Sequence, residues 1–327
     1  MRIWIGCLKF EYPAFCRALQ FFFDAAPGFS GIATVPRIFL HKGGIGEYRF
    51  LMKRIILSVL AALALGGCAS SDGGCARPKH RNVAVQAYSM HKITLAQALE
   101  KLKGAGVDGI ELFPGQKLGG RYPDAKVGPA LSAEQTAYLK EILKDAGIKP
   151  VSFGVARGGS EKDIEAICKF AKEMGITRVL TEDPVASWEI WDRVGKKYGV
   201  AMCVHHHDKG SANQYYDADL VRRYASRYAN VKSNPDIGHL SRCGIDPVEY
   251  LKTLEGEIGS VHIKDQKEFG DPRDQCVPLG EGKIGMDRVL AELDRQGYDG
   301  FLVIEYEADW DDNLPQIKKC VEYLRSR

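Results

Sequence analysis

Several common signatures are absent from the sequence, and each absence excludes a class of protein. None of the nine cysteines is paired as Cys-x-x-Cys, so the usual zinc and dithiol redox motifs are missing. No Gly-x-Gly-x-x-Gly follows the first apolar run of the main domain, which argues against a dinucleotide-binding sheet. The longest apolar stretch is well under the roughly 20 residues that a transmembrane helix needs.

A short apolar stretch near the N-terminus has the features of a secretion signal. Lys53 and Arg54 precede an apolar run, and the segment ends at Leu65-Gly66-Gly67-Cys68. This ending resembles the bacterial lipobox, in which the cysteine is lipidated and becomes the mature N-terminus. We therefore expect a lipoprotein signal peptide over residues 52–67 and a lipid anchor at Cys68, which would make the protein a bacterial cell-envelope lipoprotein facing the periplasm or the outer surface.

A signal peptide has to be N-terminal, so residues 1–51 are expected to be an overextended N-terminus. The alternative is a genuine N-terminal arm that contains an internal hydrophobic helix. Residues 68–80 are small, polar and basic, which suits a tether between the lipid and the folded domain.

Charge also limits the possible partners. The whole chain has 45 Lys and Arg against 42 Asp and Glu, but its first 54 residues hold eight of the basic and three of the acidic residues. The chain from Cys68 onward is therefore slightly acidic, with 37 basic and 39 acidic residues. Nucleic-acid binders normally carry a basic surface that meets phosphates, so no nucleic-acid partner is expected.

Residues 81–327 alternate regularly between short apolar runs and segments with helical periodicity. Eight such pairs fill the region, from the run that starts at Val83 to the helical segment that ends the chain. Glycine followed at once by an apolar residue, as at Gly147 and Gly199, marks helices that end directly before a strand. Eight repeats with no spare domain predict a single α/β domain, a (β/α)8 TIM barrel.

In such a barrel, the chemistry lies where strands end and the following loops begin. The expected strand ends carry carboxylates, imidazoles and one lysine amine: Glu111, Glu182, His205, His207, Asp236, His262, Lys264 and Glu305. Within the triplet from His205 to His207, only the first and third side chains can share a face of the strand. So many carboxylates at one mouth require a compensating cation, and their oxygen-rich chemistry favours Mn²⁺ or Mg²⁺, with Co²⁺ and Zn²⁺ left open.

Four motifs carry a resemblance over nearly all of residues 81–327: Asp236-Ile237-Gly238-His239, His262-Ile263-Lys264-Asp265, Gly280-Glu281-Gly282 and Ile304-Glu305-Tyr306-Glu307. Together they resemble the xylose isomerase-like TIM barrels, the sugar isomerase and epimerase group that shares its fold with endonuclease IV. The resemblance implies one divalent metal, Mn²⁺ favoured, held by Glu182, Asp236, His262 and Glu305. It also implies a substrate contact from His239, and a position behind the ligands or against the sugar for His205 and His207. Glu111 and Lys264 are further candidate substrate contacts because they lie at strand ends of the same mouth. The alternative for each is a plain ion pair, at the barrel rim for Glu111 and with Asp265 for Lys264.

Departures from endonuclease IV narrow the expected function. The positions at which that enzyme has extra histidine ligands read Glu111-Leu112-Phe113 and Ser152-Phe153-Gly154 here, so a three-metal cluster lacks ligands. A lipoprotein address also argues against DNA repair and against phosphosugars, which are cytosolic.

The resemblance therefore implies a metal-dependent isomerase or epimerase that acts on an unphosphorylated keto-sugar through an enediolate, with Glu182 and Glu305 as the acid–base pair. A 3-keto-glycoside lyase or hydratase would use the same intermediate, and a non-catalytic carbohydrate-binding lipoprotein is the alternative of another class. The sequence leaves the oligomeric state open.

Overall fold

The computed structural model describes residues 80–327 apart from residues 211 and 274. The chain divides into two units, residues 1–75 and 76–327, and the described residues all belong to the second. The expected N-terminal extension, the signal peptide, Cys68 and the tether up to residue 79 lie outside the described residues.

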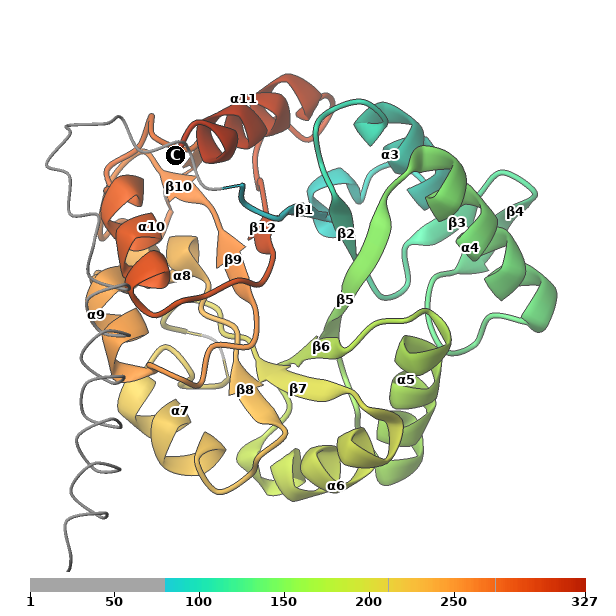
Figure 1. Ribbon diagram of the computed structural model, residues 1–327, viewed down its shortest axis with the longest axis horizontal. Helices are drawn as coiled ribbons and strands as arrows, with labels where there is room; N and C mark the ends of the chain where they lie inside the picture. The colour runs from blue at the N-terminus through green and yellow to red at the C-terminus, as the bar shows by residue number, and fades with distance from the viewer. Residues whose placement is uncertain (1–79, 211, 274) are drawn as a thin grey trace, which may run out of the picture. The chain divides into compact units, whose positions relative to one another are not determined.

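A sheet of eight parallel strands forms the centre of the described domain (Figure 1). In sheet order, the strands are β8 (Val231–Ser233), β7 (Ala201–Val204), β6 (Arg178–Thr181), β5 (Lys149–Ala156), β2 (Gly109–Leu112), β1 (Val83–Gln86), β12 (Leu302–Ile304) and β9 (Val261–Ile263). Parallel bridges between Ser233 and Ile258 and between Asp236 and His262 connect β8 with the β9 segment. The backbone of His262 also donates to the carbonyl of Pro235, so the eight strands close into a barrel, as the sequence predicts.

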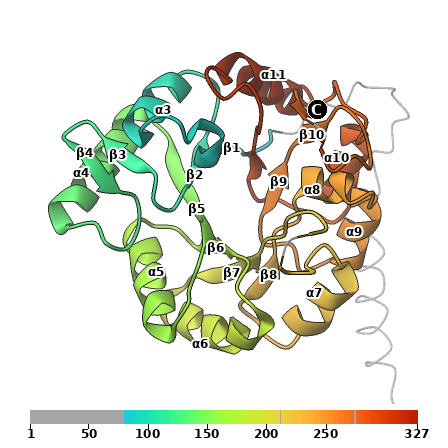
Figure 2. The same cartoon turned by 180° about the vertical axis from the view of Figure 1, so that it is seen from behind.

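Helices surround the strands (Figure 2). They are α3 (Leu95–Leu102), α4 (Ala133–Ala146), α5 (Glu161–Glu173), α6 (Trp188–Tyr198), α7 (Ala218–Ala225), α8 (Ile237–Arg242), α9 (Pro247–Thr253), α10 (Met286–Arg295) and α11 (Leu314–Arg325). Two short 3₁₀ turns, η1 (Ala87–Met90) and η2 (Val185–Ser187), follow β1 and precede α6. No helix in the described residues has the length and apolar character of a membrane span.

The glycine signals at helix ends are confirmed. Gly147 and Gly199 cap α4 and α6 in the left-handed region, at φ values of 70° and 71°. The next residue in each case donates back into the helix, from Ile148 to Leu143 and from Val200 to Gly195. This closing pattern turns each helix directly into the next strand.

Three elements depart from the simple eightfold repeat. A hairpin of β3 (Lys117–Gly119) and β4 (Tyr122–Lys126) follows β2, and a second, β10 (Asp265–Gln266) with β11 (Cys276–Val277), follows β9. Helix α8 begins directly after Asp236. All three lie in segments that follow the carboxyl ends of barrel strands, where the structure gathers the polar side chains.

Candidate metal centre

His262 lies at the centre of the polar cluster and is fully buried on β9. Its Nε2 is 3.0 Å from Glu111 Oε1, and Ser152 Oγ donates to the other oxygen of that carboxylate at 2.5 Å. Its Nδ1 is 3.0 Å from Glu305 Oε2 and 3.4 Å from Asp236 Oδ2. Both ring nitrogens thus face carboxylates, and a proton on Nε2, held by Glu111, would leave Nδ1 free to bind a metal beside Asp236 and Glu305.

Asp236 is held by backbone groups on both sides. Its Oδ1 accepts the N–H of His239 at 2.8 Å and so caps α8, while its own N–H donates to His206 Nε2 at 3.1 Å. His206 is 1% exposed, and its burial lowers its pKa to about 3, so the ring stays neutral and can accept that bond. The middle histidine of the triplet therefore positions Asp236 from outside the cluster.

His205 joins two groups of ligands. Its Nδ1 is 3.0 Å from Glu182 Oε1, and its Nε2 is 3.5 Å from Asp236 Oδ2. His207 contacts the same oxygen of Glu182. Burial favours the neutral form of Glu182, but the hydrogen bonds to the two histidines outweigh it and lower the pKa of Glu182 to about 2.

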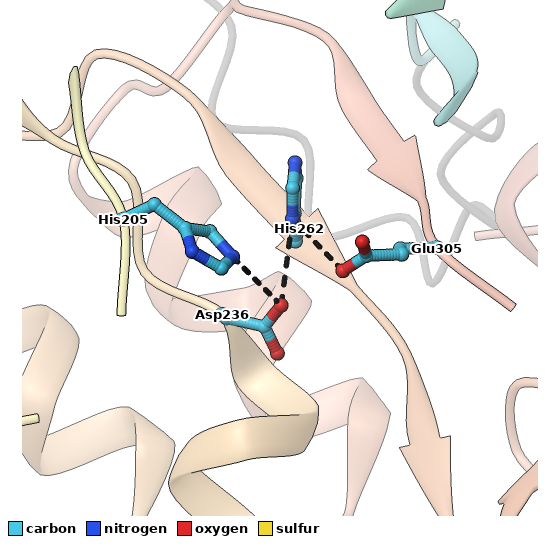
Figure 3. Close-up of side chains that lie close together, drawn as sticks. All are labelled: His205, Asp236, His262 and Glu305. Atoms are coloured by element: carbon cyan, nitrogen blue, oxygen red, sulfur yellow. Dashed lines mark hydrogen bonds and ion pairs between the residues drawn. The ribbon is translucent and has the colours of Figure 1, made fainter. Parts of the chain in front are cut away.

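Figure 3 shows how His205, Asp236, His262 and Glu305 converge. One possible ligand atom from each lies within 4.8 Å of the others, and all four residues are buried. A second such group consists of Glu182, His205 and His207. The structure thus brings three of the four expected ligands together with His205, and it places Glu182 in contact with that histidine.

Lys264 supplies a fixed positive charge beside the cluster. Its buried Nζ is 2.7 Å from Glu305 Oε2, 3.1 Å from Asp236 Oδ2 and 3.1 Å from Glu307 Oε2. Burial opposes the charged form, but the three carboxylates outweigh it and raise the pKa of Lys264. Lys264 and His262 in turn hold the pKa of Glu305 well below its usual range, against the effect of burial.

The charge balance of this network fits a divalent cation. It contains four carboxylates, Glu111, Asp236, Glu305 and Glu307, and two permanent cations, Lys264 and Arg242, whose guanidinium is 3.2 Å from Glu307. Burial opposes the charged form of His262, but Glu111 and Glu305 raise its pKa well above the usual value, so a proton on His262 offsets part of the remaining negative charge in the metal-free protein. A divalent cation would take the place of that proton. His205 Nε2 and Asp236 Oδ2 face each other at 3.5 Å, and no hydrogen bond to His205 Nε2 forms within the described residues, which suits a ligand atom.

The residues expected to contact substrate differ in accessibility. His207 is 46% exposed, whereas His239 is buried, and their ring centroids are 4.8 Å apart, so His207 is the one of the two that opens to solvent. Glu111 and Lys264 are buried, and each contacts proposed ligands directly.

Ser152, Glu307 and Arg242 were not predicted as site residues, although Glu307 lies within the Ile304-Glu305-Tyr306-Glu307 motif. The position of Glu307, two residues after Glu305 at the end of an expected strand, was the one available signal.

The sequence profile of the xylose isomerase-like TIM barrel family matches residues 99–327, and the chain belongs to this family. It is 24% identical over 262 residues to the rhizopine catabolism protein MocC of Rhizobium meliloti, covering 66% of this chain and 75% of MocC. It is 33% identical over 94 residues to L-ribulose-5-phosphate 3-epimerase UlaE of Salmonella paratyphi A, covering 28% of this chain and 32% of UlaE.

Solved structures of similar fold include an uncharacterised protein from Parabacteroides distasonis, with 28% identity, a TM-score of 0.62, and coverage of 75% of this chain and 98% of that one. At lower identity, the fold is shared with the probable 3-DHS dehydratase AsbF of Bacillus anthracis (17%, TM-score 0.60, coverage 75% and 99%). It is also shared with 3-keto-D-glucoside 4-epimerase of E. coli (16%, TM-score 0.58, coverage 76% and 100%).

Proposed function

We propose that the protein is a sugar isomerase or epimerase that depends on one divalent metal, Mn²⁺ favoured, and acts on an unphosphorylated keto-sugar. The observation that carries the proposal is the orientation of His262, whose Nδ1 faces Asp236 and Glu305 while Glu111 fixes the opposite nitrogen. Asp236, His262 and Glu305 would hold the metal, with Glu182 or His205 completing the set. The sugar epimerases among the relatives support the same reaction class.

The positions of Glu182 and Glu305 suit proton transfer on two faces of a substrate. Glu182 follows β6 and Glu305 follows β12, and four steps separate these strands in the closed eight-stranded order. The two carboxylates therefore start from opposite sides of the barrel. The bound metal would act as a Lewis acid for the negative charge that develops on the sugar carbonyl oxygen.

The proposed reaction moves one proton at a carbon next to that carbonyl. One glutamate carboxylate takes the proton from carbon, and the electron pair of the C–H bond moves toward the carbonyl oxygen to give an enediolate. Both glutamates are ionised in the resting site, so the other one takes a proton from water and delivers it to the opposite face of the same carbon, which inverts the centre. Return of the proton to the neighbouring carbon would instead isomerise the sugar.

Elimination is the second candidate outcome. From the same enediolate, loss of a substituent at the adjacent carbon would make the enzyme a 3-keto-glycoside lyase or hydratase. Two structural neighbours support this candidate: a probable dehydratase, which performs an elimination, and an epimerase that acts on a 3-keto-glucoside. The lipoprotein address expected from Cys68 favours an unphosphorylated sugar in both cases.

The test uses two substrate panels, free ketoses and 3-keto-glycosides. Proton NMR monitors the turnover of each panel with and without Mn²⁺. Metal-dependent formation of an epimer or isomer supports the proposal, whereas release of the anomeric substituent selects the lyase. Sugar binding with no turnover in either panel would contradict both and point to a carbohydrate-binding lipoprotein.

A further inference from the structure

Four partly exposed aromatic rings gather beside the candidate metal centre. Tyr88 lies on η1, His91 follows it, Phe113 directly follows β2, and Trp310 lies in the loop after β12. The ring of Tyr88 stacks on His91 with centroids 4.6 Å apart. Phe113 and Trp310 make T-shaped contacts with Tyr88, with centroid distances of 5.1 and 5.7 Å. We call these four side chains the aromatic platform.

The platform belongs to the mouth that holds the cluster. Strands β2, β1 and β12 are neighbours in the sheet, so the segments that follow their carboxyl ends share one side of the barrel. Glu305 directly follows β12, five positions before Trp310. Burial, and then the charges of Glu307 and Glu305, raise the pKa of Tyr88, in agreement with this placement.

Several bonds hold the two loops of the platform together. Ser89, next to Tyr88, accepts the backbone N–H of Tyr306 through its hydroxyl at 2.9 Å, and its carbonyl accepts from Asn313. Two ion pairs add to this, Lys92 with Asp311 at 2.9 Å and Lys101 with Asp312 at 3.0 Å. These contacts give the loops a defined arrangement.

The backbone just before Trp310 is itself unusual. Asp309 has a φ of 49°, the left-handed region that few residues other than glycine occupy, and its carboxylate accepts from the Tyr306 hydroxyl at 2.9 Å. Strained backbone of this kind clusters at ligand sites, where it sets the direction of a neighbouring side chain. Here it sets the course of the chain that presents Trp310.

We propose that the aromatic platform binds a second pyranose ring, so that the substrate is a glycoside with at least two rings rather than a free monosaccharide. Aromatic rings offer large, rigid apolar surface to the C–H face of a sugar, and a few polar groups beside them provide specificity. Lys92, Asp311 and Asp312 border Trp310 and supply such groups for sugar hydroxyls. This inference rests on the proposed function, in which the reacting ring lies at Asp236 and Glu305.

The test is calorimetric titration of the full chain with Mn²⁺ present. The probes are maltose, cellobiose, lactose and melibiose, each compared with the methyl glycosides of its two component sugars. We expect at least one disaccharide to bind about tenfold more tightly than either of its methyl glycosides. Trp310→Ala and His91→Ala should remove most of this ratio. Tyr198→Ala alters a partly buried aromatic at the far end of α6, and it should preserve the ratio.

Thermal unfolding confirms that each variant is folded before its titration is interpreted. The proposed second-ring site is contradicted if no disaccharide binds more tightly than its methyl glycosides. It is also contradicted if Trp310→Ala leaves the ratio of the two affinities unchanged. Failure of the proposed function has a different signature: disaccharide binding stays dependent on Trp310, but no substrate proton exchanges with solvent. If single-ring ketoses exchange a proton with solvent and no sugar binding depends on Trp310, the proposed function stands and the second-ring site at the aromatic platform is contradicted.

Discussion

The ammonium of Lys264 lies 2.7 Å from the carboxylate of Glu305 in a buried site. The same nitrogen contacts Asp236 and Glu307, so one lysine partly neutralises two proposed metal ligands and a neighbouring carboxylate. The lysine and the metal would therefore neutralise the same group of negative charges. This relationship makes the stability of the metal-free protein depend on Lys264.

We predict that Lys264→Met destabilises the metal-free protein by roughly 3–5 kcal/mol, because removal of one partner leaves uncompensated buried charge. Mn²⁺ should recover part of this loss, so the metal should raise the melting temperature more in Lys264→Met than in the wild type. Lys319→Met, which removes an exposed ion pair with Glu281, is the matched control and should change little. An equal rise in melting temperature with Mn²⁺ in Lys264→Met and in the wild type would contradict the idea that the lysine and the metal neutralise the same carboxylates.

Metal affinity should depend strongly on the proposed ligands and more weakly on the carboxylate that orients His262. Asp236→Ala combined with His262→Ala removes two proposed ligands and should abolish retention of the single ion per chain. Glu111→Gln should weaken metal affinity by roughly 10- to 100-fold, the usual cost of losing a carboxylate that orients a ligating histidine. Elemental analysis after dialysis and competition with a chelator measure both effects. Asp124→Ala, on an exposed strand, is the control.

Much of this architecture is predictable from the sequence, for identifiable reasons. The eight strands follow from apolar runs that alternate with helical periodicity, and Gly147 and Gly199 mark two of the junctions. The site side chains follow from one rule, that polar residues at strand ends meet at one mouth. The role of His206 could not be predicted, because its bond to the backbone of Asp236 joins two strands through a ring whose direction the sequence leaves open.

The Gly280-Glu281-Gly282 motif gained a physical explanation only from the structure. The N–H groups of Gly280 and Gly282 donate to Asp265 Oδ2 at 2.9 and 3.2 Å. A Cβ on Gly282 would lie 2.2 Å from the Asp265 carboxylate, so the close approach requires glycine there. The neighbours Lys264 and Asp265 therefore have different partners, the carboxylates of the cluster for Lys264 and the glycine N–H groups for Asp265.

Acidic pH should remove the stabilisation that the Glu292 carboxylate on α10 contributes to the folded protein. Hydrogen bonds from Arg295, and a further one from Gln296, lower the pKa of buried Glu292 from 4.5 to about 2. A lowered pKa stabilises the folded state above the unfolded value, and the benefit disappears as pH falls from about 4.5 toward 2. The difference in urea midpoint between wild type and Glu292→Gln should thus be larger at pH 7 than at pH 3. An equal difference at both values would remove this explanation.

We also propose that Cys68 is the lipidated N-terminus of the mature protein. Mass spectrometry of the protein from bacterial membranes should find an acylated peptide that begins at Cys68, and Cys68→Ala should release the protein from the membrane fraction. Recovery of mature chains that retain residues 55–65 would contradict the processing, because that segment would have been removed with the signal.

The proposed reaction moves a proton at the carbon next to a sugar carbonyl. Its most direct test is the incorporation of deuterium from D₂O at that carbon at saturating Mn²⁺, compared between wild type, Glu305→Gln and Glu281→Gln as an exposed control. We predict exchange in wild type and in the control, and a loss of roughly 10²- to 10⁴-fold in Glu305→Gln even when metal is fully bound. Exchange at the wild-type rate in metal-saturated Glu305→Gln would contradict the acid–base role of Glu305. No exchange in any wild-type reaction would contradict the proposed function itself.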